Sequence, residues 1–407
     1  MLVVGLKNIP VIVCLGLILL FPYAAQDVSA ADSLKIEARA YILMEQETGR
    51  VLAGKHEQRP YPPASLTKIM TEYLILKDVQ AGRLNWDDRV EISPRTEKIG
   101  EAQVHLRAGE KPTVKELFKA MAVYSANDAA VALAEKAAGS ETAFVKRMNR
   151  EAARLGLKET HFINATGLPK NSYPDPPKVE GKNQMSARDI ARLTRQLLDT
   201  FPDVTEITGI PTFAFQRGDS EFSLTNRNRM LPGLSHFYPG VDGVKTGYTS
   251  QAGYNFVGSA EREGMRLITV VMGTDSNGER FLETETLLNY GYDTYRKQAL
   301  IERGKEIPGH RSLPVEAGID REVAIVPTET REVPVRKKEK SDYQVIVKAN
   351  RNLEAPVRAQ TVVGKAWILY DGKKVPGIEP VTLVAKDSVE KASWITLVSR
   401  IIGSWFR

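Results

Sequence analysis

The chain has 407 residues, a formal net charge of +6, 42% hydrophobic residues and 26% charged residues. A chain of this length normally forms more than one core, and this composition excludes extended disorder, so we expect two or more folded domains. A surplus of +6 spread over 407 residues is weak for a nucleic-acid-binding surface, so we expect no nucleic acid partner.

The N-terminus has the layout of an export signal. Lys7 precedes an apolar run from Ile9 to Phe21, and Val28-Ser29-Ala30 follows. A positive charge, a short apolar run and small residues are typical of a secretory signal peptide, so we assign residues 1–30 to one, cleaved after Ala30. The alternative is an uncleaved membrane anchor, for which the run is short. We therefore expect an exported protein.

Cysteine and histidine usage limits the chemistry. The only cysteine, Cys14, lies inside the apolar run and would be removed with the signal peptide. Thiol catalysis and cysteine-based metal sites are then excluded from the mature chain. The five histidines are scattered, without the spacing of metal ligands, so we expect no metal site.

The first half of the chain alternates between a strand and several helices. Residues 38–44 predict a strand, and further along Pro62 and Pro63 stop any regular element. From Ser65 onward apolar residues recur at helical spacing, which predicts a helix beginning there. Similar patterns, two of them closed by Gly139 and Gly156, predict further helices. These helices cover residues 113–124, 128–138, 141–155 and 186–198.

Residues 160–185 form a long loop rich in Pro, Asn and Gly, of a length that often serves a function. A stretch rich in strands comes next, and a helix over 280–296 closes it. The strands are expected at 212–216, 221–225, 240–246, 254–260 and 266–272. Strands at both ends with helices between them predict an α/β (α+β) domain over 31–298 whose sheet is mostly antiparallel.

Two smaller parts follow. Residues 299–385 contain short Val/Ile-rich runs with Asp371-Gly372 between two of them, which predicts a small all-β domain. Residues 386–407 predict an amphipathic helix on a membrane surface, or alternatively a helix packed on the protein. The apolar positions at helical spacing are Trp394, Leu397, Val398, Ile401 and Trp405.

The first chemical motif is Ser65-Leu66-Thr67-Lys68. Residues three apart share a helix face, so Lys68 can reach the Ser65 hydroxyl. A serine hydroxyl is a weak nucleophile that needs a base, and an amine serves as a base only when it is neutral. This tetrad alone favours a helix cap beside an exposed lysine, since Ser388-Val389-Glu390-Lys391 repeats the spacing by chance.

Two further motifs make the first one specific. Ser125-Ala126-Asn127 lies between two predicted helices, and Lys245-Thr246-Gly247 lies on a predicted strand. Taken alone, these are a helix cap and a strand end. In the order S-x-x-K, S-x-N, K-T-G they resemble the motif set of penicillin-binding proteins and β-lactamases, with Ala126 where that set has Asp.

The resemblance is closest to the low-molecular-weight penicillin-binding proteins that are D-alanyl-D-alanine carboxypeptidases. It covers about residues 35–295 and implies a β-lactamase/transpeptidase-like fold, with the β domain and amphipathic tail similar to that family's later parts. Further matching segments are Pro63-Ala64, Asn127-Asp128-Ala129-Ala130, Asn164-Ala165-Thr166-Gly167-Leu168-Pro169, Asp242-Gly243-Val244 and Gln251-Ala252-Gly253-Tyr254-Asn255.

The resemblance implies a role for each catalytic residue. Ser65 attacks the carbonyl of the penultimate D-Ala and forms an acyl-enzyme. Lys68 takes its proton. Ser125, helped by Lys245, relays a proton to the leaving D-Ala.

The remaining motif residues are implied to bind substrate. Asn127 holds the substrate backbone, and Thr246, together with Arg227 in a less specific match, binds the terminal carboxylate. Gly247 lets the substrate approach the strand, and the backbone N–H groups of Ser65 and Tyr248 form the oxyanion hole. No metal or organic cofactor is implied.

The implied partners are the peptidoglycan pentapeptide, β-lactam inhibitors and a membrane surface bound through the tail. The implied location is the outer face of the cytoplasmic membrane, as a peripheral protein. Three alternatives remain open. One is a serine β-lactamase, although the segment Glu159 to Asn164 lacks that class's deacylating glutamate pattern. The others are a non-catalytic wall-binding scaffold, and endopeptidase or transpeptidase activity.

Overall fold

The computed structural model describes residues 34–217, 220–337, 342–350, 353–375 and 377–405, with side chains up to residue 400. The predicted signal peptide lies outside the described residues. In the described part of the chain, no helix has the length and apolar character needed to cross a membrane.

A five-stranded sheet forms the centre of the first domain. Its strand order is β2-β1-β9-β8-β7, and every neighbouring pair is antiparallel, as the sequence predicted. The strands are β1 (Ala40–Glu45), β2 (Val51–Lys55), β7 (Val241–Thr249), β8 (Gly253–Arg262) and β9 (Met265–Thr274). Strand β1 therefore pairs with β9 across more than half of the chain, and β7 is left at an edge.

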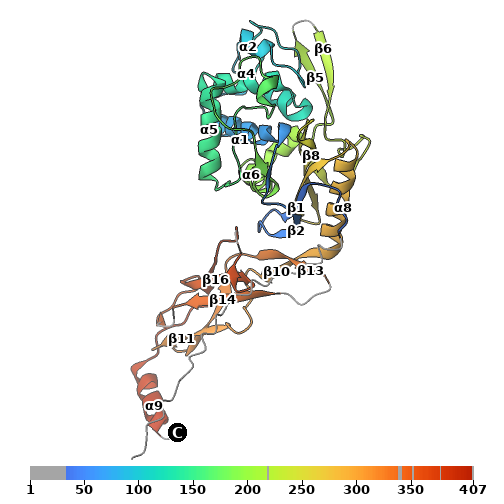
Figure 1. Cartoon of the computed structure of the whole chain (residues 1–407). Helices are drawn as coiled ribbons and strands as arrows, with labels where there is room; N and C mark the ends of the chain where they lie inside the picture. The colour runs from blue at the N-terminus through green and yellow to red at the C-terminus, as the bar shows by residue number, and fades with distance from the viewer. Residues whose placement is uncertain (1–33, 218–219, 338–341, 351–352, 376, 406–407) are drawn as a thin grey trace, which may run out of the picture. The chain divides into compact units, whose positions relative to one another are not determined.

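Helices cover the sheet. Figure 1 shows α1, α4, α5 and α6 gathered on one side of it and α8 on the other. The α-helices of this domain are α1 (Lys68–Gln80), α2 (Pro94–Glu97), α3 (Val114–Lys119), α4 (Asn127–Ala138), α5 (Glu141–Arg154), α6 (Ala187–Thr200), α7 (Thr205–Thr208) and α8 (Glu279–Thr294). The buried apolar side chains of α1, α3, α4, α5 and α6 join those of β1 and β9 in one core, which makes burial of this surface the main stabilising contribution.

Helix ends follow local rules that the sequence carries. Thr113 and Glu116 form a reciprocal capping box before α3. Ser140 and Ser186 cap α5 and α6 by accepting backbone N–H bonds, and Gly139 ends α4 in the left-handed region. These caps explain why the predicted and observed helix ends differ by only one or two residues.

Two predicted helices are interrupted beside the cleft described below. The helix expected from Ser65 begins with a 3-10 turn, η2 (Ala64–Thr67), and becomes α-helical only at Lys68. The helix expected over 113–124 changes after Lys119 into a π-helical turn, η3 (Ala120–Tyr124). Such turns within helices often mark functional sites.

Short elements complete the first domain. Strands β5 (Thr212–Arg217) and β6 (Ser220–Thr225) form a hairpin, while β3 (Pro60–Tyr61) pairs with β4 (Met185–Ser186). Two 3-10 turns are η4 (Lys170–Ser172) and η5 (Pro202–Val204).

The second domain is all-β, as predicted. Strand β10 (Tyr295–Ile301) pairs with β13 (Arg331–Arg336), and a separate seven-stranded sheet has the order β14-β16-β18-β12-β11-β15 with β17 beside β16. Its strands are β11 (Ser312–Glu316), β12 (Glu322–Pro327), β14 (Tyr343–Ala349), β15 (Leu353–Glu354), β16 (Val362–Tyr370), β17 (Lys373–Lys374) and β18 (Val381–Ala385). It has its own core of valine and isoleucine side chains. Helix α9 (Trp394–Trp405) ends the described chain.

The long loop over 160–185 packs tightly on η2. Asn164 Oδ1 accepts the N–H of Gly167 at 2.7 Å, and its Nδ2 donates to Leu168 O at 2.7 Å. Gly167 has φ +86°, and a Cβ placed there would lie 1.8 Å from Ala64 O. Only glycine therefore allows this loop to approach the turn that carries Ser65.

This contact generates a stability prediction with a matched control. Gly109 has nearly the same φ (+85°) but no heavy atom within 4 Å of an added Cβ. Gly109→Ala should lower the free energy of unfolding by about 1–2 kcal/mol, the cost of a left-handed alanine. Gly167→Ala should lose roughly 1–3 kcal/mol more, because the Ala64 backbone must also move. Chemical denaturation measures both, and equal losses would contradict the proposed backbone contact.

Candidate active site

A cleft of about 710 Å³ opens where η2, η3, β7 and the long loop meet. The predicted site residues Ser65, Ser125, Asn127, Arg227, Thr246, Gly247 and Tyr248 all line it. The two remaining predicted residues, Lys68 and Lys245, are buried behind its lining. The structure thus brings together residues that are up to 183 positions apart, from Ser65 to Tyr248.

The Ser65 hydroxyl is presented by the 3-10 turn η2. Its oxygen lies 3.0 Å from Lys68 Nζ, because residues i and i+3 of such a turn lie one above the other. Ser65 is partly exposed to the cleft while Lys68 is fully buried. Ser65 therefore does not act as the helix cap that its position alone suggested, since no side-chain cap bond is made before α1.

Lys68 is held by three oxygens. Nζ is 2.6 Å from Asn127 Oδ1, 3.2 Å from Thr166 O and 3.0 Å from Ser65 Oγ. A neutral amine has two N–H groups and one lone pair. The oxygens of Asn127 and Thr166 are acceptors only, so each takes one N–H bond from the amine. The lone pair of the amine is then free to accept the hydroxyl proton of Ser65.

The electrostatics favour that neutral amine. Burial is the main reason that the pKa of Lys68 lies well below its usual value, and the positive charge of Lys245 lowers it further. The carboxyl groups of Glu72 and Asp128 act in the opposite direction. Lowering the pKa of an amine increases the fraction that is neutral and able to accept a proton.

Ser125 has a strained backbone conformation. It lies directly after the π-helical turn η3, and its own φ is 70°, a left-handed conformation that a serine adopts at a free-energy cost. Its Oγ accepts a 2.7 Å hydrogen bond from Lys245 Nζ, which also donates to Thr246 O at 3.3 Å. The alternative role of Ser125 as a helix cap is wrong, because Ala126 holds the N-cap position of α4.

Asn127 joins the two halves of the site. As the first residue of α4 it accepts from Lys68 through Oδ1 and donates through Nδ2 to Gly100 O at 2.9 Å. One hydrogen of Nδ2 remains available to the cleft.

The edge strand β7 lies directly against η2. A Cβ on Gly247 would be 2.9 Å from Pro63 O and 3.1 Å from Ser65 N, so glycine is needed for this approach. On the same strand, burial lowers the pKa of Lys245 to about 7; the Glu72 carboxylate opposes this shift, and the positive charges of Arg227 and Arg280 favour it.

The rim of the cleft carries the other predicted binding residues. Arg227 donates through Nε to Tyr124 O at 3.4 Å, and its guanidinium lies 4.2 Å from the centre of the Tyr124 ring. Tyr248 exposes 52% of its surface and stacks on Tyr254 with ring centres 4.3 Å apart. Arg227 and Thr246 both face the same hollow, which is suited to binding an anion.

Arg280 is a residue of this site that the sequence motifs did not identify. From α8 it donates through one nitrogen to Gly247 O and Asn255 O, both at 3.2 Å, and it also bonds Asn277. It is almost fully buried, which lowers its pKa to about 10. No motif marks it, because its role depends on the strands that α8 covers.

A buried network behind the long loop was also missed. Thr166, whose carbonyl accepts from Lys68, bonds Tyr173 OH through its hydroxyl at 2.9 Å. Tyr173 donates to Glu141 at 2.9 Å, and Arg95 pairs with the other Glu141 oxygen at 2.6 Å. This chain of bonds fixes the loop that holds Lys68.

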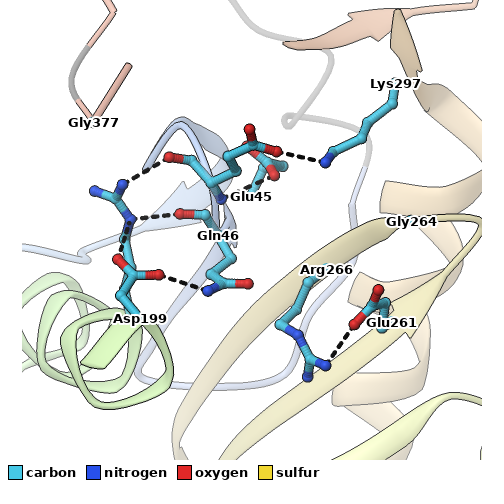
Figure 2. Close-up of a pocket in the computed structure, with 10 residues that line it drawn as sticks. Glu45, Gln46, Asp199, Glu261, Gly264, Arg266, Lys297 and Gly377 are labelled. Atoms are coloured by element: carbon cyan, nitrogen blue, oxygen red, sulfur yellow. Dashed lines mark hydrogen bonds and ion pairs between the residues drawn. The ribbon is translucent and has the colours of Figure 1, made fainter. Parts of the chain in front are cut away.

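A second hollow, lined in part by Arg195, Asp199, Arg266 and Lys297, offers no comparable chemistry (Figure 2). Its charged side chains pair with neighbours: Lys297 with Glu47 and Arg266 with Glu261, each at 2.5 Å. Across the residues that the structure describes, no cluster of three or more His, Cys, Asp or Glu side chains is arranged to hold a metal ion.

Two family models match the chain. Residues 25–276 match D-alanyl-D-alanine carboxypeptidase, and residues 295–391 match the C-terminal domain of penicillin-binding protein 5. The curated D-alanyl-D-alanine carboxypeptidase DacF of Bacillus subtilis is 35% identical over 385 residues, covering 94% of each chain. DacC of Escherichia coli is 32% identical over 403 residues, again covering 94% of each.

Solved structures agree with these matches. A peptidoglycan synthesis regulatory factor (PBP3) from Streptococcus pneumoniae has a TM-score of 0.77 and 31% identity, over 88% of this chain and 100% of that one. Penicillin-binding protein D2 from Listeria monocytogenes, solved with bound ampicillin, has a TM-score of 0.55 and 32% identity, over 64% of this chain and 99% of that one.

Arg280 generates a prediction for the site. Arg280→Met removes two charged hydrogen bonds to backbone carbonyls of β7 and β8. Their loss, worth about 1.5–3 kcal/mol, should slow labelling of the protein by a fluorescent penicillin roughly ten- to hundredfold. The control is Arg262→Met, which removes a 3.0 Å bond to Pro239 O away from the cleft. Equal rates in the two variants would contradict a positioning role for Arg280.

Proposed function

Because this chain belongs to the D-alanyl-D-alanine carboxypeptidase family, it is a serine peptidase of that specificity, and we propose that Ser65 is the residue acylated by its substrate, the pentapeptide stem of peptidoglycan. The observation that carries the proposal is the pair of lysine–serine contacts: Lys68 Nζ lies 3.0 Å from Ser65 Oγ, and Lys245 Nζ lies 2.7 Å from Ser125 Oγ. β-Lactams would acylate the same oxygen, and a relative has been solved with bound ampicillin.

The proposed acylation step uses both pairs. Neutral Lys68 accepts the proton of Ser65 as Oγ attacks the carbonyl carbon of the penultimate D-Ala. The C–N bond to the terminal D-Ala then breaks, and its nitrogen takes the proton of the Ser125 hydroxyl, which the Lys245 ammonium holds in place. Protonated Lys68 returns a proton to Ser125 and becomes neutral again. Water later hydrolyses the acyl-enzyme and regenerates Ser65.

Binding groups surround this centre. Arg227 and Thr246 are suited to the free carboxylate of the terminal D-Ala, which distinguishes a chain end from a mid-chain peptide. The remaining Nδ2 hydrogen of Asn127 is available to a substrate carbonyl. The backbone N–H groups of Ser65 and Tyr248 flank the contact between η2 and β7, and would stabilise the oxyanion of the tetrahedral intermediate.

The proposed function also implies a domain organisation for the whole chain. We propose a signal peptide over residues 1–30, a catalytic domain over 31–298, a β domain over 299–385 and a membrane-associating helix over 386–407. The enzyme would then act outside the cytoplasm, held on the outer face of the cytoplasmic membrane.

Helix α9 supports the peripheral location. Trp394, Ile395 and Val398 expose 74%, 62% and 44% of their surfaces, which is unusual for such apolar side chains. Arg400, on the same helix, donates to Gly318 O at 2.7 Å and Ile319 O at 2.6 Å, tying the helix to the β domain. An interfacial helix rich in Trp and apolar residues fits this arrangement.

The nucleophile can be tested with a matched pair of serines. Ser65→Ala should abolish penicillin labelling and D-Ala release, because among the described residues the hydroxyl bonded to Lys68 Nζ is that of Ser65. Ser388→Ala should leave both intact, since Ser388 is in a non-helical segment and accepts a bond from Ala359 N at 2.9 Å. Mass spectrometry of the labelled peptide locates the adduct, and labelling retained in Ser65→Ala would disprove the assignment.

Membrane association has its own test. Removal of residues 394–407 should abolish binding to anionic vesicles. The rate at which the enzyme releases D-Ala should be unchanged. The cut spares Val389, which exchanges bonds with Val357, and Ala392, which donates to Ala317 O at 2.8 Å. The triple variant Trp394→Ser, Ile395→Ser, Val398→Ser should be released equally. Sedimentation with vesicles measures binding, and unchanged binding of both forms would refute the interfacial helix.

A further inference from the structure

A buried carboxyl group lies beneath the active site without a bonding partner. Glu72 is on α1, one turn after Lys68, and its side chain has 0% exposure. Neither carboxylate oxygen has a hydrogen-bond partner among the described residues. Burying an unpaired carboxyl group lowers the stability of the folded state, so an unpaired buried carboxyl points to a functional role.

The charges that act on Glu72 are those of Lys245 and Lys68, in that order. Glu72 is likewise the foremost charge acting on Lys245, ahead of Arg227 and Arg280. The carboxylate is therefore coupled to the lysine of β7 more strongly than to the lysine on its own helix.

The other charged group near Lys68 is already occupied. Asp128 of α4 also acts on Lys68. Its carboxylate accepts backbone N–H bonds from Val104 and Leu106, at 3.1 Å each through Oδ2. Glu72, in contrast, has no hydrogen bond among the described residues that would partly neutralise its charge, so its full field acts on the two lysines.

The proposed reaction needs the two lysines in opposite states. Lys68 must be neutral to accept a proton, while Lys245 must be an ammonium to hold Ser125. Two buried ammonium groups would repel each other, and without a counter-charge burial would neutralise both. We propose that Glu72 is a positioning residue whose ionised carboxylate keeps Lys245 protonated while Lys68 stays neutral. This inference rests on the proposed function.

The attraction between Glu72 and Lys245 acts in the direction of this role, against the effect of burial. Burial raises the pKa of Glu72 to about 7 and lowers that of Lys245 to about 7, and the attraction between the two opposes both shifts. Loss of the carboxylate therefore lowers the pKa values of both lysines, because each loses a stabilising negative charge.

The test is the pH profile of Glu72→Gln, which removes the charge and keeps the shape. The acidic limb of kcat/KM follows deprotonation of Lys68, and the alkaline limb follows loss of the Lys245 proton. The alkaline limb should move to lower pH by about one unit, the size expected for nearby charges at an effective dielectric of about 20. The acidic limb should move less, because Glu72, with a pKa of about 7, is largely protonated at acidic pH and carries little charge to lose. The variant should therefore lose activity relative to wild type mainly in alkali.

Two comparisons make the outcome decisive. Glu72→Asp keeps the charge, so its limbs should stay at wild-type positions for both D-Ala release and penicillin acylation. Limbs that do not move in Glu72→Gln, with a rate reduced equally at every pH, would overturn the inference as a packing effect. An inactive wild-type enzyme would instead overturn the proposed function.

Folding of the variants is checked by thermal unfolding. If Glu72→Gln does not fold, carbon-13 NMR of glutamate-labelled wild type gives the answer, with the Glu72 resonance identified by its loss in Glu72→Asp. A carboxyl that becomes ionised by the pH of maximal activity supports the inference. One that stays protonated through the alkaline limb overturns it.

Discussion

The geometry of the candidate active site is built around two buried lysine amines, each beside a serine hydroxyl. Lys68 and Lys245 lie behind the lining of the cleft, while Ser65 and Ser125 open into it. Burial weakens the charged form of an amine and strengthens every interaction around it. A free-energy cost of this kind is sustained only by a large packed core, which the antiparallel sheet and its covering helices provide.

The surrounding backbone is shaped to hold those four groups. The 3-10 turn presents Ser65, the π-helical turn puts Ser125 into the left-handed region, and Gly247 lets β7 reach the backbone of η2. Each is a departure from regular geometry, and each lies at the cleft. The left-handed Ser125 thus places local strain where the chemistry requires a fixed direction.

Much of this arrangement could be predicted, and the reasons differ by feature. Apolar periodicity and capping residues such as Thr113 and Gly139 are local, so the long helices and four of the five strands of the antiparallel sheet followed from the sequence. Strand β2 was not predicted. The motif residues were identified because they occur in order and resemble a known family. The interruption at Lys119 was not predicted, since helical periodicity alone does not distinguish an α-helical turn from a π-helical one.

The groups that were missed act through partners distant in sequence. Arg280 matters because α8 covers β7 and β8, and Glu141 because it bonds Tyr173 and Arg95. Glu72 belongs to no motif, and a glutamate in a helix is ordinarily exposed. Its complete burial and the charge of Lys245 acting on it appear only in the folded structure. The surroundings of each amine are therefore a property of the assembled core. Lys68 contacts the Ser65 hydroxyl and two carbonyl oxygens, whereas Lys245 contacts the Ser125 hydroxyl and one carbonyl oxygen, with Glu72 as the foremost charge acting on it. In the proposed mechanism, these different neighbours are what allow one lysine to act as a base and the other to remain an ammonium.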